Sequence, residues 1–523
     1  MQSTVSHDSL QVFIAKHVIN GTEITQLLKQ IISYDCIPLR WMEYFKTTAV
    51  LFVSEKHNDV LERTGIAIDY LWEQLNTGHW KDVSISVRIA YSVMSLIRSV
   101  TLARMPEPDS IEALRVCDMG LIMGAPLGDN LLAKLGTIIH VAVVSHNGVY
   151  SIDPKDIKSE RPSSPPVDSK KLRLDLAIAE NEVRQITNPT LEEFETIFLD
   201  RKPVVITNAM SHWPAMRRWS VNYILTVAGY RTVPVEVGSK YTDDSWTQQL
   251  MTLNEFAQNH LVNSRANGIG CADNETRPIG WSKSHSNRIG YSEVAQTNLI
   301  GCSVYEKKPI PNSAQTSPAD FSEIQANTIG HHRTGVNSCG YLPVQKNSVG
   351  HSLQTSTEDS ATEMNAIGYT LAERNLIGYV AQYQLFEQIT ELGKDICIPD
   401  YCAVADNGES SLSIDTNAWF GPGGTVTPAH TDLRDNLLCQ VFGSKIVRLF
   451  SPDDNENMYP YEGIMNNTSQ VDVERPDFEK FSKFKNVKQY CCRLEPGEML
   501  FIPKGWWHFV RSEQCSFSVS FWF

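Results

Sequence analysis

The sequence predicts an α+β protein in two parts, an N-terminal α-helical domain and a C-terminal β-rich domain that forms a sandwich or barrel. Three observations lead to this prediction. Apolar residues recur at helical spacing early in the chain, a polar, proline-rich stretch follows, and short β-forming runs separated by turns fill the remainder. At 523 residues the chain is long enough for two or more domains with sizeable cores.

The helical domain is expected over residues 1–150. Apolar residues three and four positions apart indicate amphipathic helices in ITQLLKQIISY, VLERTGIAIDYLWEQL and ISVRIAYSVMSLIRSV. Such helices often form scaffolds that bind partners, and no residue in this part points to chemistry. The apolar segment LGTIIHVAVV is too short to span a membrane, so we expect it in the core.

A linker is expected over residues 151–171, where DPKDIKSERPSSPPVDSKK is rich in proline, serine and charge and poor in aliphatic residues. The β-rich domain follows over 172–523, with expected strands in PVVITN, VPVEVG, KIVRLF, EMLFIP and CSFSVSFWF. A low-complexity insertion interrupts it at about 267–375, where phrases such as NRIGY, NLIG and NAIGY recur among polar residues. This composition cannot bury enough apolar surface to offset the entropy of ordering.

The composition restricts the classes of function. A net charge of −14 argues against direct nucleic-acid binding, which needs a basic face, and is compatible with a basic protein partner. Eleven cysteines without a C-x-x-C pair favour a reducing compartment, so we expect the nucleus, the cytoplasm or both. The sequence has no signal-peptide pattern and no apolar run of transmembrane length, so no membrane association is expected.

The stretch TPAHTDLRDN carries His430 and Asp432 between two apolar segments. Residues i and i+2 of a strand share a face, so these side chains are expected to project together. Two histidines and one carboxylate form the facial triad that holds Fe(II) and leaves positions open for other ligands. The H-x-D pattern alone is common. It also occurs at His57 and Asp59, but there in a predicted helix, where i and i+2 do not share a face.

The second histidine is expected in EPGEMLFIPKGWWHFVRS, where an apolar strand and a Lys-Gly turn precede Trp506, Trp507 and His508. A lone histidine in an aromatic strand is often a packed core residue. Together with the upstream H-x-D pattern, His508 completes the triad. The two neighbouring tryptophans are expected to shield a metal from bulk water.

A 2-oxoglutarate cosubstrate would chelate the iron through its keto-acid end and would need a buried cation for its far carboxylate. Lys445 follows CQVFGS and has the strand parity of Val447 and Leu449, an apolar face. We therefore expect Lys445 to be buried and to face an anion. Thr427 and Asn436 supply uncharged donors beside the H-x-D strand.

These segments together resemble the jumonji-C (JmjC) family of 2-oxoglutarate oxygenases, in particular its lysine-demethylase and arginyl-hydroxylase branch. The resemblance is carried by NAWFGPGGTVTPAHTDLRDNLLCQVFGSKIVRLFSP, LEPGEMLFIPKGWWHFVRS and SFSVSFWF, with further support from NTSQVDVERPDFEKFSKF, VPVEVGSKYTDDSW and GYVAQYQLFEQI. It covers most of residues 172–523 apart from the insertion. It implies a double-stranded β-helix, which is a jelly-roll, cupin-like barrel, with the metal in the barrel mouth.

The resemblance also implies roles for individual residues. The implied iron ligands are His430, Asp432 and His508. The implied 2-oxoglutarate-binding residues are Tyr379, Thr427, Asn436, Lys445 and Trp522. The implied substrate-binding residues are Glu236, Tyr241, Trp246 and Trp419. This last set is chemically reasonable, because a guanidinium pairs well with a carboxylate and stacks on flat aromatic walls.

The implied function is hydroxylation of a basic side chain in a protein substrate, dependent on Fe(II), 2-oxoglutarate and O2. Glu236 favours an arginine-containing segment as the substrate. The alternative is histone lysine demethylation by the same chemistry, with a histone tail as partner and a role in chromatin regulation. A third hypothesis is a catalytically inactive barrel that serves as a binding scaffold; the intact triad and Lys445 argue against it.

Overall fold

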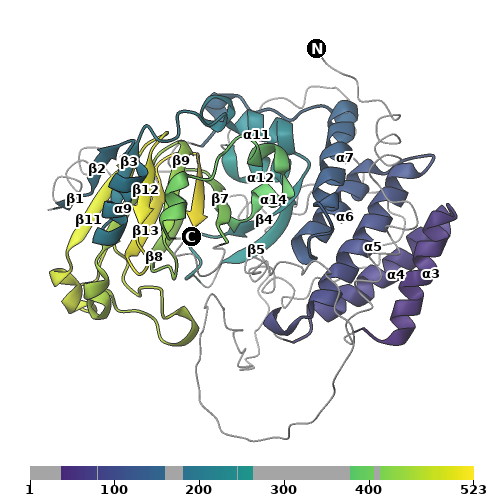
Figure 1. The fold of residues 1–523 in the computed structure, drawn as a ribbon, viewed down its shortest axis with the longest axis horizontal. Coiled ribbons are helices and arrows are strands. Elements are labelled where there is room, and N and C mark those ends of the chain that lie inside the picture. The colour runs from purple at the N-terminus through teal and green to yellow at the C-terminus, as the bar shows by residue number, and fades with distance from the viewer. Residues whose placement is uncertain (1–36, 79, 159–180, 244–245, 263–376, 406–412) are drawn as a thin grey trace, which may run out of the picture.

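The computed structural model confirms the α+β class, with helices gathered at one end of the molecule and strands at the other (Figure 1). The predicted insertion and the N-terminal segment ITQLLKQIISY lie outside the described part of the chain. The structure describes residues 37–78, 80–158, 181–243, 246–262, 377–405 and 413–523.

In the described part of the N-terminal domain four helices pack around a fifth, α5, most of whose residues are buried. They are α3 (Leu39–Val53), α4 (His57–Leu75), α5 (Ile85–Arg104), α6 (Ser110–Met123) and α7 (Leu131–Asn147). Ser84 and Asp109 accept hydrogen bonds from backbone N–H groups in the first turns of α5 and α6, as N-cap residues do. The helices predicted in VLERTGIAIDYLWEQL and ISVRIAYSVMSLIRSV are confirmed as α4 and α5.

Helix α5 is long and apolar enough to cross a membrane by length and composition, a property that the sequence-based expectation missed. In the structure 83% of its most apolar window is buried inside the protein, between α4 and α6. Such burial is typical of the central helix of a packed helical domain. The shorter apolar segment in α7 also contributes to this core, as expected, through Leu135, Ile139 and Val143.

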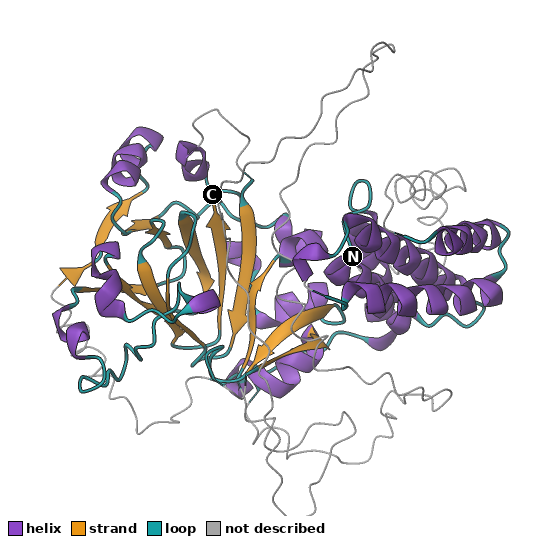
Figure 2. Ribbon diagram, turned by 90° about the horizontal axis from the view of Figure 1, so that it is seen from below, coloured by secondary structure: helices purple, strands orange, loops and turns teal. Residues whose placement is uncertain are grey.

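Two β-sheets form the barrel, and Figure 2 shows them on the side opposite the helical part. The five-stranded sheet has the order β1 (Asn181–Glu182), β11 (Gln489–Leu494), β10 (Lys445–Phe450), β13 (Trp507–Ser512) and β8 (Val426–His430). The nine-stranded sheet has the order β2 (Arg184–Thr187), β3 (Val204–Thr207), β12 (Met499–Ile502), β9 (Asn436–Phe442), β14 (Ser516–Trp522), β7 (Asp415–Gly421), β6 (Gly378–Tyr383), β4 (Thr232–Val237) and β5 (Thr247–Thr252). Each of the five predicted β runs is a strand.

Short helices cover the nine-stranded sheet or connect its strands (Figure 1). The α-helices are α9 (Leu191–Asp200), α10 (Ala215–Arg218), α11 (Val221–Ala228), α12 (Leu253–Phe256), α14 (Leu385–Gln388) and α15 (Thr390–Gly393). The remaining turns of helix are η1 (Trp80–Asp82), η2 (Pro154–Asp156), η3 (Ala257–Leu261), η7 (Asp400–Ala405), η8 (Pro452–Met458), η9 (Gly463–Met465) and η10 (Ser482–Asn486).

Strand alternation separates an apolar core from a polar barrel interior. On β14, Phe517, Val519 and Phe521 belong to the main hydrophobic core, which the short helices cover. The intervening serines point to the other face. There Ser518 donates a hydrogen bond to Gln440, and Ser520 accepts one from the Trp419 indole. The sheet is therefore stabilised on its covered face, which leaves its inner face available for polar side chains.

A buried ion pair joins the helical part to the barrel. Arg231, directly before β4, and Asp118 of α6 are 1% and 0% exposed, and their closest nitrogen and oxygen atoms are 2.7 Å apart. The Asp118 carboxylate also accepts hydrogen bonds from the Thr232 backbone and the Gln388 amide, each at 2.8 Å. Gly136 of α7 leaves room for the guanidinium, because a Cβ there would lie 2.7 Å from an Arg231 nitrogen.

Part of the predicted linker packs against the barrel domain. The Asn222 side chain accepts a hydrogen bond from the Ile152 N–H and donates one to the Ile152 carbonyl. Ile157 forms a β-bridge with Val262. Residues 159–171 of the predicted linker lie outside the described residues.

Replacement of Asp118 by asparagine should lower the free energy of unfolding by about 3–5 kcal/mol, since it leaves the buried Arg231 guanidinium without a counter-charge. Urea unfolding followed by circular dichroism measures this loss. The matched control is Arg115→Ala, which breaks an exposed ion pair with Glu112 on the same helix and should cost no more than about 1 kcal/mol. Equal losses for the two variants would contradict a structural role for the buried pair.

Candidate active site

The two candidate histidine ligands lie opposite each other on neighbouring antiparallel strands. His430 is the last residue of β8, which is an edge strand of the five-stranded sheet. An edge strand tolerates Pro428, because a proline there need not donate a hydrogen bond to a second neighbouring strand. His508 is the second residue of β13 and is the direct cross-strand partner of His430. A register irregularity follows between His508 and Val510. Such bulges commonly redirect side chains beside functional sites.

Asp432 joins these histidines from a loop rather than from a strand. The expectation that His430 and Asp432 share one strand face is wrong, because β8 ends at His430. Two backbone hydrogen bonds hold the loop instead. The Gly505 N–H donates to the Asp432 carbonyl at 3.0 Å, and the Thr431 N–H donates to the Asn467 carbonyl at 2.8 Å. The side chains nevertheless converge, as the H-x-D pattern predicts.

The geometry of the triad fits a metal ion. The candidate ligand atoms of His430, Asp432 and His508 all lie within 4.8 Å of one another. Nε2 of His430 is 3.7 Å from one Asp432 oxygen, and Nε2 of His508 is 3.5 Å from the other. That second oxygen, Oδ2, is buried and has no hydrogen-bond partner. A carboxylate whose two oxygens each face an imidazole nitrogen, one of them buried and unpartnered, is part of the donor set expected around a divalent cation.

The backbone orients both imidazoles. Nδ1 of His430 lies 2.8 Å from the Pro428 carbonyl, and Nδ1 of His508 lies 3.0 Å from the Trp506 carbonyl. These contacts place the protons on Nδ1 and leave the Nε2 lone pairs free for a metal. Burial and the nearby His430 lower the pKa of His508 to about 4. His508 is therefore neutral at pH 7, as metal ligation requires.

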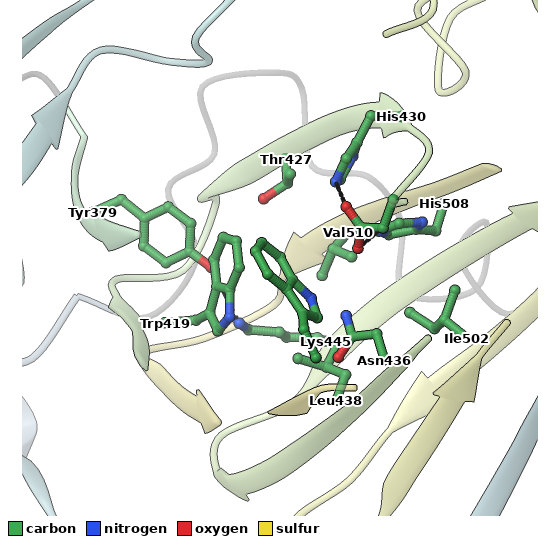
Figure 3. A pocket seen from close by; sticks show the side chains of 12 residues that line it. Tyr379, Trp419, Thr427, His430, Asn436, Leu438, Lys445, Ile502, His508 and Val510 are labelled. Atoms are coloured by element: carbon green, nitrogen blue, oxygen red, sulfur yellow. Dashed lines mark hydrogen bonds and ion pairs between the residues drawn. The ribbon is translucent and has the colours of Figure 1, made fainter. Parts of the chain in front are cut away.

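A cavity of about 370 Å³, including its open mouth, adjoins the triad, and Figure 3 shows the side chains that line it. His430 and His508 lie at one end and Lys445 at the other. Besides the triad, the lining residues are Tyr379, Trp419, Thr427, Asn436, Leu438, Lys445, Ile502, Val510 and Trp522.

Lys445 is buried, as its strand parity predicted, with 1% of the residue exposed. Its ammonium group donates a hydrogen bond to the Tyr379 hydroxyl at 3.2 Å. Burial lowers the pKa of Lys445 to about 7, because the cavity offers the ammonium little solvation and no carboxylate offsets that loss. Burial also raises the pKa of Tyr379, so the tyrosine remains a neutral hydrogen-bond donor.

Two further polar groups in this cavity are buried without a hydrogen-bond partner. They are Oδ1 of Asn436 and Nε1 of Trp522. Both belong to residues that were predicted to hold 2-oxoglutarate, and all five residues of that predicted set line the cavity. Buried polar atoms are rarely left unpaired in folded proteins. Their presence here therefore indicates a cavity shaped for a polar ligand or ordered water.

A smaller pocket of about 220 Å³ shares Tyr379 with this cavity and is lined by the partly buried Glu236. Nε1 of Trp246 donates to that carboxyl at 3.4 Å. Burial raises the pKa of Glu236 to about 7, and the bond from Trp246 only partly opposes this shift. A cation that entered this pocket would stabilise the ionised form of this carboxyl and lower its pKa.

The other predicted residues are distributed more widely. Trp419 lines the larger cavity, whereas Tyr241 lines neither pocket and contacts Thr468 through its hydroxyl at 3.4 Å. The prediction that Trp506 and Trp507 shield the metal is wrong. Their rings pack in two separate hydrophobic clusters, and neither lines the cavity. The aromatic walls are instead Tyr379, Trp419 and Trp522.

The sequence-based prediction missed the apolar lining of the cavity. Leu438 and Val510 each follow a predicted site residue by two positions in a strand, and both point into the cavity. The same alternation that placed Lys445 could have identified them. Ile502, at the end of β12, gave no such signal, because its place depends on pairing with Asn436 across the sheet.

Comparisons with known proteins agree with this geometry. The cupin-like domain family matches residues 190–523, and the family described as KDM8-like, N-terminal ARM repeats matches residues 51–149. Lysine-specific demethylase 8 of Danio rerio is 35% identical over 88% of this chain and 87% of its own length. The Xenopus tropicalis protein of that name is 32% identical over 87% of each chain. Jumonji C domain-containing protein 5 of Drosophila melanogaster is 28% identical over 88% of this chain and 85% of its own.

Replacement of Asp432 by alanine should weaken binding of Fe(II) or its probe Co(II) at least a hundredfold, because it removes the only anionic ligand of the triad. Anaerobic titration calorimetry measures this affinity. The chain supplies its own control in the second H-x-D pattern, where Asp59 is exposed on α4. Asp59→Ala should bind the metal with the affinity of the wild type. An equal loss of affinity in both variants would contradict the assignment of the metal site to His430, Asp432 and His508.

Proposed function

This chain belongs to the JmjC branch of the cupin-like family, and from that premise we propose that it is an Fe(II)- and 2-oxoglutarate-dependent oxygenase that hydroxylates arginine in a protein substrate. One observation carries the proposal. A triad fit for a metal, a buried lysine and a partly buried glutamate line two pockets that share Tyr379 as a common wall. Each group complements a different participant in such a reaction.

The triad would hold Fe(II) through Nε2 of His430, Nε2 of His508 and the Asp432 carboxylate. When bound, Fe(II) with 2-oxoglutarate and O2 supplies the oxidation, in which the keto acid becomes succinate and CO2 and one oxygen atom enters a substrate C–H bond. The chain itself binds, orients and excludes water. The barrel walls Leu438, Ile502 and Val510 are apolar and keep the space beside the triad poorly hydrated.

The far carboxylate of 2-oxoglutarate would pair with Lys445 and accept a hydrogen bond from the Tyr379 hydroxyl. The 3.2 Å bond between the two groups keeps both donors at the same end of the cavity. Thr427 and Asn436 offer further polar atoms along the wall, and Trp522 packs nearby. This arrangement supports a linear dicarboxylate that lies between the lysine and the triad.

The Glu236 pocket supports arginine as the side chain to be oxidised. A partly buried carboxyl such as Glu236 gains most from a partner that brings both a charge and several donors, and a guanidinium brings five N–H groups in a rigid plane. The indole of Trp246 lines the same pocket, and Trp419 lines the neighbouring cavity; such flat rings suit a planar cation.

Histone lysine demethylation is the second candidate function. The relatives from Danio rerio and Xenopus tropicalis bear the name lysine-specific demethylase 8, and the same oxidation on an N-methyl carbon would release formaldehyde. A methylated ammonium has fewer donors than a guanidinium, so it would use the Glu236 carboxyl less fully.

Mass spectrometry of arginine-containing and methyl-lysine-containing peptides, each incubated with the protein, Fe(II), 2-oxoglutarate and O2, separates these candidates. A gain of one oxygen atom on arginine supports the proposal. Formaldehyde release with loss of a methyl group supports demethylation. If the folded, metal-loaded protein forms no succinate with any peptide, both oxygenase functions are contradicted and the binding-scaffold hypothesis is supported.

Replacement of Lys445 by methionine should raise the dissociation constant of 2-oxoglutarate by about a hundredfold, because the far carboxylate would lose its buried counter-charge.

The affinity of the wild type for 2-oxoglutarate should also depend on pH. Below pH 7 the lysine carries its proton before the dicarboxylate binds; above pH 7 binding must take up a proton, so affinity falls as pH rises.

The methionine variant should lose this pH dependence. Lys504→Met removes an exposed ammonium and serves as the control. Calorimetric titration of the metal-loaded protein at several pH values tests both points, and an unchanged profile in Lys445→Met would contradict this role for Lys445.

Replacement of Glu236 by glutamine should lower kcat/KM for an arginine peptide about tenfold to a hundredfold, which is the value of one charged hydrogen bond of ~1.5–3 kcal/mol. Binding of 2-oxoglutarate should be unchanged, because Glu236 lines the other pocket. A proportional loss of arginine and methyl-lysine turnover would show that Glu236 does not distinguish the two substrates.

A further inference from the structure

The two loops that carry Asp432 and lead into His508 meet at the C-terminal end of α9. Figure 1 shows α9 beside β3 and β12, and rings of Phe194 and Phe198 on this helix contact Phe501 of β12. The first loop covers 431–435, between β8 and β9. The second covers 503–506, between β12 and β13. Neither is a regular element, so its position depends on specific contacts.

Arg201, directly after α9, holds the first loop through its side chain. The guanidinium donates two hydrogen bonds to the Asp435 carboxylate, at 2.6 and 3.2 Å. The same carboxylate accepts a third bond, from the Lys504 N–H at 2.7 Å. Asp435 thereby connects the loop of Asp432 to the loop that precedes His508.

The backbone of Arg201 holds the second loop. Its carbonyl accepts a hydrogen bond from the Trp506 indole at 2.8 Å. The carbonyl of Trp506 in turn accepts the Nδ1 proton of His508 at 3.0 Å and fixes that imidazole. A continuous path of contacts therefore runs from one residue at the end of a helix to two of the three candidate metal ligands.

The backbone conformation of Arg201 indicates that its side chain has a specific role. Arg201 has φ +54° and ψ +34°, the left-handed conformation in which helices usually end with glycine. An arginine there is less favourable than glycine, and an ion pair that is 40% exposed on the arginine side stabilises a fold by about 1 kcal/mol at most. The guanidinium offsets this cost with two contacts, the Asp435 carboxylate and the Phe198 ring, whose centroid lies 4.9 Å from the guanidinium carbon.

We propose that Arg201 and Asp435 are positioning residues, which hold the Asp432 and His508 loops at the separation that a metal ion requires. The inference rests on the proposed metal site. Neither residue lines the cavity, so the effect acts through the ligands and not on a substrate. Their loss should widen the range of distances between the Asp432 carboxylate and Nε2 of His508 and so weaken metal binding.

The test uses Arg201→Gly, which removes the side chain but suits the left-handed backbone, so the fold is expected to persist. Asp435→Asn keeps the size of the side chain and removes the charge. Each variant should bind Co(II), the probe, about tenfold more weakly than the wild type, and the double variant no more weakly than either single one. The visible spectrum of bound Co(II) reports ligand geometry independently of activity.

The matched control is Arg218→Ala, which breaks a comparable 2.6 Å ion pair with Asp395 in the same domain but away from the two loops. It should leave both Co(II) affinity and spectrum unchanged. If the wild type and Arg201→Gly bind Co(II) equally with the same spectrum, the positioning role is wrong and the proposed metal site stands. If the folded wild type binds no Co(II) or Fe(II), both the inference and the proposed function fail.

Discussion

The antiparallel pairing of β8 with β13 is the interaction on which the site depends. It sets His430 directly opposite His508, with the centroids of the two imidazole rings 4.2 Å apart. A slip of one residue would turn one imidazole to the opposite face of the sheet and separate the ligands. The neighbouring strand β10 pairs with β13 along its whole length, from Lys445 opposite Ser512 to Phe450 opposite Trp507. The same sheet therefore fixes the distance between Lys445 and the triad.

The sequence predicted those features that depend on short-range alternation and composition. Lys445, Val447 and Leu449 share a parity that indicated a buried lysine, and the aromatic alternation of SFSVSFWF indicated a strand with one apolar face. Features that depend on loops were less accessible. Asp432 reaches the triad from beyond the end of β8, and the path through Arg201 joins segments that are far apart in the chain. The tryptophans at 506 and 507 were misplaced because strand parity does not say which of two hydrophobic clusters a ring will enter.

The helical part also bears on the site. Arg231, which pairs with Asp118 of α6, precedes β4, and Glu236 lies farther along that strand. The end of β6 is held in the same way, since the Tyr383 hydroxyl donates to Gln388, whose amide donates to Asp118. β4 and β6 pair with each other at Glu236 and Tyr379. The helical domain thus anchors the two strands that carry Glu236 and Tyr379, which favours a role in shaping the pockets that these residues line.

Each charged group of the site lies in surroundings that disfavour its charge or leave one of its atoms unpaired. The ligand that would relieve this differs from one group to the next. Asp432 has a buried oxygen without a donor, burial lowers the pKa of Lys445, and burial raises the pKa of Glu236. Under the proposed function a divalent cation, a dicarboxylate and a guanidinium would satisfy them in turn. Such local conflicts persist in folded proteins where the surrounding structure is stable enough to hold them. Here the apolar core around Phe517 and Phe521, on the opposite face of the sheet, supplies that stability.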